Sequence, residues 1–262
     1  MHRDVAGAIE AMGLILEPTY GPIPPHKVVR RNPRWHKEEF TWQPIRAHRA
    51  SLYSDNTSRL VYDPKIIEDY IAKDADYPVK ENTAYVCYAL LHDVFHMYQA
   101  QRGVVRQSHQ NHWIEGCADA AAIAFILGNS RASRQISEIA TRYLRAPVSM
   151  EDIEDIAIRQ LARKLVALTQ RKLIASANVE WLYLPFSLSQ HNQARTDDVA
   201  TRWFTEKIWA SQSTLKYTLG AYRLWRIAAI EGVAMSHLLM TPISDRRLRN
   251  KARSLGEKRP GA

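Results

Sequence analysis

Two histidines and an aspartate interrupt the apolar segment 84–100 of the chain: His92, Asp93 and His96. Histidines four residues apart lie on the same face of an α-helix, one turn apart, so their imidazoles can converge on one point. Convergent imidazoles are suited to binding a metal ion. Among 10 histidines in 262 residues, chance alone would give roughly 0.4 such pairs. The pair therefore needs support from other residues before it predicts a site.

Two acids in the next apolar segment, Glu115 and Asp119, supply that support. They are four apart, and a helix–loop–helix hairpin would return their helix antiparallel beside the first, so Glu115 can reach a metal held by the imidazoles. Asp119, one turn further along, would accept the free ring N–H of a ligand histidine. His109 and His112, in the predicted connecting loop, are rival ligands or contacts to a substrate in its transition state; ordinary solvated loop histidines are the alternative.

The set His92-Asp93-x-x-His96 followed by Glu115-x-x-x-Asp119 resembles the active site of gluzincin metallopeptidases, in particular the compact ImmA/IrrE-like ones, over about residues 58–128. In that family the motif is H-E-x-x-H, a short strand precedes the motif helix, and a glutamate on the next helix completes the site. The resemblance implies that His92, His96 and Glu115 bind zinc. It also implies that Asp93 polarises the zinc-bound water and that Asp119 orients a ligand histidine. The implied activity is hydrolysis of a protein or peptide substrate.

Asp93 departs from the family pattern, because the usual residue is glutamate. Aspartate is one methylene shorter, so its carboxylate retracts by roughly 1 Å, and a misplacement of that size in a catalytic group can cost about 100-fold in rate. Metal binding does not depend on this residue, since it is not a ligand. Three interpretations stay open: a slow hydrolase, an enzyme whose helix shifts to compensate, and a zincin fold that has lost peptidase function.

Two further hypotheses compete with the enzyme. His92, His96, Glu115 and Asp119 could form a metal-free, hydrogen-bonded polar cluster between two helices, or be exposed by accident. The chain could also be a non-enzymatic structural or assembly protein with a zincin-like core, which binds protein partners or nucleic acid through its Pro-rich arm and basic tail. No Ser-His-Asp set and no glycine-rich phosphate loop indicates another chemistry.

The candidate residues must be positioned by helices. Apolar residues at helical spacing predict helices over 1–16, 65–73, 81–101, 112–128, 131–145, 150–176, 197–211 and 214–240. A β-prone run that begins at Ser58 and is closed by Asp63-Pro64 predicts a strand before the motif helix. Six prolines between Pro18 and Pro44 favour an extended, irregular segment. The predicted fold class is mainly α: a zincin-like core with a small β element before the motif helix, followed by an all-helical C-terminal half.

Four segments are expected along the chain: an N-terminal helix and Pro-rich arm over 1–44, the metal-binding core over 45–146, a helical region over 147–245 and a basic tail over 246–262. The net charge of +9 favours contact with polyanions. In the tail, Arg246-Arg247-Leu-Arg249-Asn-Lys251-Ala-Arg253 could contact nucleic acid or an acidic partner, or be a solvated helix end.

The bulk composition, 46% hydrophobic and 24% charged, is that of an ordinary globular protein with a sizeable core. No apolar run is long enough to cross a membrane, and the N-terminus lacks the layout of a signal peptide, so a cytoplasmic protein is expected. The two cysteines, Cys87 and Cys117, lie in apolar helical patterns and are expected to be buried thiols.

Overall fold

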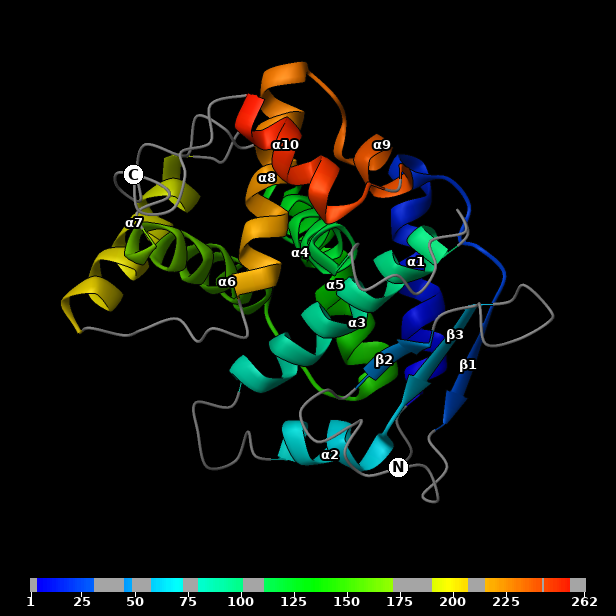
Figure 1. Cartoon of the computed structure of the whole chain (residues 1–262). Helices are drawn as coiled ribbons and strands as arrows, with labels where there is room; N and C mark the ends of the chain where they lie inside the picture. Colours follow the sequence, from blue (N-terminus) through cyan, green and yellow to red (C-terminus); the bar gives the residue numbers. More distant parts are fainter. Residues whose placement is uncertain are drawn as a thin grey trace. The chain divides into compact units, whose positions relative to one another are not determined.

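The computed structural model describes residues 4–30, 45–48, 58–72, 80–100, 111–171, 190–206, 215–241 and 243–254. These residues are mainly helical, as predicted (Figure 1). The chain divides into two compact units, each made of two stretches of sequence. The first unit is Met1–Arg106 with Asn129–Ile156, and the second is Gln107–Gly128 with Ala157–Ala262. The four predicted segments stay a prediction.

A three-stranded sheet with the order β1-β3-β2 belongs to the first unit (Figure 1). The predicted strand is present as β3 (Ser58–Tyr62), which pairs in parallel with β1 (His26–Arg30) and antiparallel with β2 (Ile45–His48). We predicted an irregular segment where β1 lies. The strand forms there because Pro24 and Pro25 come before it, where a missing N–H costs no ladder hydrogen bond.

Helix α1 (Val5–Tyr20) begins at Asp4, whose side chain accepts the N–H of Gly7 at 2.8 Å. We expected a helix over 1–16, but the helix includes Pro18 in its last turn, ends at Tyr20 and is capped by Gly21, where φ is +81°. Glycine adopts this backbone conformation without a side-chain clash. The buried side of the helix includes Ile9, Met12 and Leu16.

Helix α3 (Lys80–Ala100) carries the histidine pair and matches the predicted range closely. It follows α2 (Pro64–Ala72), and α5 (Ser130–Ile139) with the π-helical turn η5 (Ala140–Leu144) also belongs to this unit. A hydrogen bond joins the end of α1 to α3, since the Tyr98 hydroxyl donates to the Gly21 carbonyl at 3.0 Å. The side chains of α3 that are fully buried around the motif are Leu90, Leu91, Val94, Phe95 and Tyr98.

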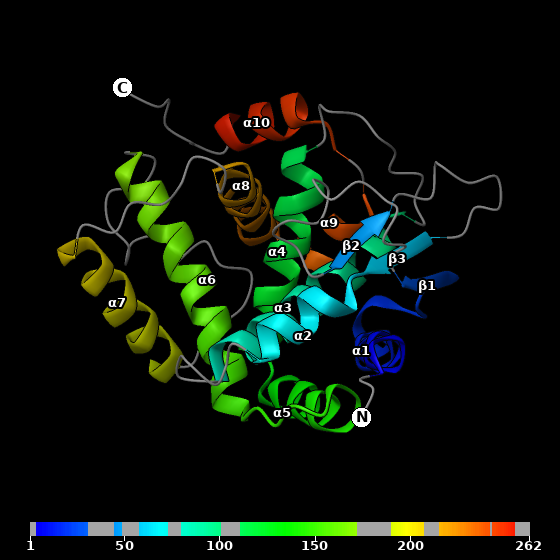
Figure 2. The same ribbon diagram turned by 90° about the horizontal axis from the view of Figure 1, so that it is seen from below.

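The second unit contains α4 (Asn111–Leu127), α6 (Met150–Gln170) from residue 157 onward, α7 (Gln190–Thr205), α8 (Leu215–Glu231), α9 (Met235–Met240) and α10 (Asp245–Ser254). Helices α4 and α8 lie side by side, as do α6 and α7 (Figure 2). At the α4–α8 contact, a Cβ atom built on Gly116 would lie 2.5 Å from the Cα of Gly220. Only glycine therefore permits this close approach of the two backbones.

Two predicted helices differ from the structure. The helix expected over 214–240 is broken into α8 and α9, because Gly232 takes a φ of +66°. The helix expected over 197–211 begins earlier, at Gln190. Its first two turns bury the polar residues Asn192 and Thr196, which apolar periodicity cannot detect.

Within the described ranges, no helix is both long and apolar enough to cross a membrane.

Candidate metal centre

The side chains of His92 and His96 meet on one face of α3. Their Nε2 atoms lie 3.0 Å apart, and the rings stand edge to face with an interplanar angle of 85°. Both residues are half-buried. The apolar residues that flank them on α3 are buried, which holds this face of the helix in place. The two imidazoles thus present the same nitrogen to one point.

Gln99 fixes the orientation of the His96 ring. Its Oε1 lies 2.7 Å from His96 Nδ1, and Gln99 is almost completely buried. An amide oxygen only accepts hydrogen bonds, so Nδ1 carries the ring hydrogen and donates it. In the neutral ring, His96 Nε2 then keeps its lone pair. Gln99 therefore holds His96 in the tautomer that a metal ion requires.

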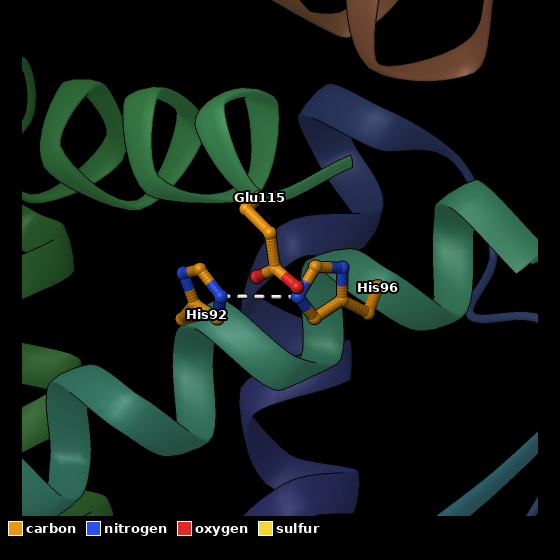
Figure 3. Close-up of side chains that lie close together, drawn as sticks. All are labelled: His92, His96 and Glu115. Atoms are coloured by element: carbon orange, nitrogen blue, oxygen red, sulfur yellow. Dashed lines mark hydrogen bonds between the residues drawn. The ribbon is translucent and has the colours of Figure 1, made fainter. Parts of the chain in front are cut away.

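Glu115 supplies a carboxylate to the same place. One ligand atom from each of His92, His96 and Glu115 lies within 4.8 Å of the other two, and all three residues are half-buried. Figure 3 shows the carboxylate of Glu115 directed at the two rings. Among the residues that the structure describes, this is the one group of three or more His, Cys, Asp and Glu side chains with a spacing that could hold a metal ion.

The donor set is chemically suited to a transition metal. Two imidazole nitrogens and one carboxylate oxygen are the protein ligands of many catalytic zinc sites, which keep a further position open for water or substrate. The same donors also occur in non-haem iron(II) sites. A metal ion could therefore bind at His92, His96 and Glu115, and the donor types alone do not select zinc.

Asp93, the predicted general base, is buried on α3 with 8% of its surface exposed. It directly follows His92 in the chain, so its backbone is held by the same helix. A buried carboxylate needs partners, and Asp93 does make interactions. Its catalytic role stays a prediction.

Asp119, predicted to orient a ligand histidine, forms a buried ion pair with Lys164 of α6. Both side chains are almost fully buried, so each offsets the cost of burying the other. Sequence analysis did not single out Lys164, since 45 residues separate it from Asp119. The predicted contact between Asp119 and a ligand histidine stays a prediction.

The two rival histidines cannot be placed as side chains. His109 lies outside the described residues, and of His112, in the first turn of α4, only the backbone is described. Their predicted roles stay predictions.

The two cysteines are buried, as expected from their apolar surroundings. Burial raises the pKa of the Cys87 thiol to about 12, and burial also raises the pKa of Cys117. Because the thiolate is the form that attacks or binds a metal, neither residue is suited to nucleophilic chemistry near neutral pH.

Comparison of the chain with protein-family models, with curated proteins and with solved structures finds no match. The resemblance to gluzincins therefore stays a prediction that depends on the residues themselves.

Proposed function

We propose that His92, His96 and Glu115 bind zinc and that the chain is a zinc-dependent hydrolase of the metallopeptidase type. The observation that supports the proposal is the approach of two imidazole nitrogens and one carboxylate oxygen to within 4.8 Å of one another. When bound at such a site, zinc polarises a carbonyl oxygen and lowers the pKa of a coordinated water.

In the proposed reaction, the residues of α3 would have separate roles. His92 and His96 hold the metal, and Gln99 keeps the lone pair of His96 Nε2 available. Asp93, next to the first ligand, would accept a proton from the attacking water. The substrate class that fits this chemistry is a peptide bond in a protein or peptide.

One observation favours the second candidate, a non-enzymatic structural protein. His92 and His96 form a hydrogen bond with each other at 3.0 Å, and His96 forms another with Gln99. These contacts satisfy part of a half-buried polar cluster without any metal. Together with the shortened acid Asp93, they are compatible with a core that serves assembly.

Metal analysis of protein purified without a histidine tag tests the metal site. We expect about one zinc per chain in the wild type, and a loss of most of it in His92→Ala, His96→Ala and Glu115→Gln, because three-ligand sites depend on every ligand. His237→Ala is the matched control, since His237 is an exposed histidine of α9. Less than about 0.2 zinc per chain in the wild type, unchanged in His92→Ala, would contradict zinc binding. Iron measured in the same samples would identify the competing metal.

A peptidase assay distinguishes the proposed hydrolase from the non-enzymatic structural protein. Hydrolysis of a dye-quenched casein should be slow in the wild type, abolished in Asp93→Asn, and faster by up to about 100-fold in Asp93→Glu, which restores the longer carboxylate. A protein that binds one zinc but shows no hydrolysis in the wild type or in Asp93→Glu would favour the structural role.

A further inference from the structure

Helix α10 (Asp245–Ser254) concentrates positive charge on its exposed side. Four of its ten residues are arginines, and all four are exposed: Arg246, Arg247, Arg249 and Arg253. Residues spaced three and four apart share one face of a helix, so Arg246, Arg249 and Arg253 project together. Arg247 flanks this row. We call these four residues the α10 arginine face.

Another side of α10 packs within the unit. Leu248 and Ala252 have no exposed surface, and the helix packs on α8 and α4 of the same unit (Figure 2). Lys251 forms an ion pair with Glu231 of α8 at 2.6 Å. The helix is therefore held at a defined rotation, which keeps the arginines directed away from the core.

We propose that the α10 arginine face binds the phosphate backbone of double-stranded nucleic acid. A guanidinium group matches phosphate with two parallel hydrogen bonds and keeps its charge at every physiological pH. Arg246 and Arg253 are seven positions apart, which corresponds to a rise of about 10 Å along the helix. That length corresponds to about three base-pair steps of a duplex, so successive arginines can reach successive phosphates. The net charge of +9 adds a long-range attraction to the same partner.

Two other classes of macromolecule fit the face less well. A helix that lies on a membrane inserts an apolar face, and the large apolar side chain of α10, Leu248, is buried in the unit. Protein partners are usually held by aromatic or aliphatic anchors, and single-stranded nucleic acid by aromatic stacking. The sequence of α10, DRRLRNKARS, has no aromatic residue. Electrostatic contact with a duplex backbone needs neither feature.

This inference is independent of the proposed hydrolase, because no metal ligand lies on α10. Each phosphate neutralised contributes about −0.9 to the slope of log Kobs against log salt concentration, so four arginines predict a slope of about −3.6 for a duplex. Affinity should not depend on base sequence, because the contacts are to the backbone.

Fluorescence anisotropy of a labelled 20-base-pair DNA duplex, titrated with the full chain between about 50 and 200 mM salt, tests the proposal. In Arg246→Gln/Arg249→Gln/Arg253→Gln the slope should fall in magnitude by about 2.7, to about −0.9, and binding at 100 mM salt should weaken by at least tenfold. Glutamine keeps helix propensity, and these side chains are exposed, so the variant should fold.

The matched control is Arg131→Gln/Arg134→Gln/Arg142→Gln, which removes the same charge from exposed arginines of α5 and η5. It should keep a slope near −3.6. Equal losses in both triple variants, or no duplex binding by the wild type, would overturn the proposal. Binding to vesicles with about 30% phosphatidylserine that depends on the α10 arginines, without binding to the duplex, would assign the face to membranes instead.

Discussion

At the scale of single residues, the hydrogen bond between Gln99 and His96 determines whether the His96 ring can bind a metal ion. Without an acceptor at Nδ1, a neutral histidine can place its hydrogen on Nε2, and that nitrogen then has no lone pair for a metal. Because Gln99 is nearly fully buried, its amide has few alternative partners in water. We therefore treat it as a positioning residue for His96.

If zinc binds as proposed, Gln99→Leu should weaken its binding by about 10- to 100-fold, the usual cost of losing a group that orients a ligand. Gln99→Glu keeps an oxygen acceptor at the same reach and should restore most of the affinity. Competition with a chromophoric chelator measures both affinities.

Nitrogen-15 NMR of the metal-free protein gives a second readout, which does not require zinc to bind. His96 should be the Nδ1–H tautomer in the wild type and a mixture in Gln99→Leu. An unchanged tautomer and unchanged zinc affinity would contradict the role given to Gln99.

Much of the candidate metal site could be predicted from the spacing of residues in the sequence. His92, His96 and Gln99 are separated by four and three residues, so a helix places them on one face, and Gln99 could have been found from that spacing. Lys164 could not, because its pairing with Asp119 depends on how distant helices pack. Tertiary contacts decide which side chain pairs with a buried acid. Such contacts between distant residues cannot be inferred from the spacing in one sequence.

At the scale of elements, apolar periodicity located the helices well where the buried side is apolar, as in α3 and α4. It failed where the buried side is polar, as at Asn192 of α7. It also failed at Gly232, where a positive φ ends α8, although a glycine inside a helical pattern is a weak signal of such a break. Strands β1 and β2 were missed because each is short and depends on β3 for pairing.

The close contact between α4 and α8 predicts a sensitive glycine. Gly116→Ala should destabilise the protein by about 1–3 kcal/mol, because the added methyl group meets backbone atoms of α8 rather than a side chain that can move aside. Urea unfolding followed by circular dichroism should show a lower midpoint with an unchanged slope.

Gly128→Ala is the control for this substitution. Gly128 follows α4 at an exposed position, and the glycines with positive φ in the described part of the chain are Gly21 and Gly232. An alanine there should be neutral or slightly stabilising. If Gly116→Ala were as stable as Gly128→Ala, the backbones of α4 and α8 could not lie as close as described.

At the scale of the whole molecule, two buried ionisable groups, the Cys87 thiol and the Tyr98 hydroxyl, predict that the protein loses stability at high pH. Burial raises the pKa of Cys87 from 9.0 to about 12. Burial, and secondarily the negative charge of Glu17, raises the pKa of Tyr98 from 10.0 to about 12. Between pH 9 and 12 the folded chain therefore holds protons that the unfolded chain has released. The free energy of unfolding should be constant with respect to these groups below pH 9 and fall as the pH rises towards 12.

Urea midpoints measured at several pH values between 8 and 11.5 would test this dependence. Tyr98→Phe loses the hydrogen bond to Gly21, so it should be less stable at pH 8 by about 1 kcal/mol. The gap to the wild type should then narrow above pH 10, since phenylalanine has no proton to release. A gap that stays constant to pH 11.5 would contradict the raised pKa of Tyr98.

The burial of both cysteines also makes the chain convenient for spectroscopy. Maleimides react with thiolates, and the natural thiols of the folded protein are almost entirely protonated at neutral pH. A cysteine introduced at an exposed position, such as Leu14 with 61% of its surface exposed, would therefore take up a fluorophore or spin label selectively. Probes could be attached at chosen helices without first replacing Cys87 and Cys117.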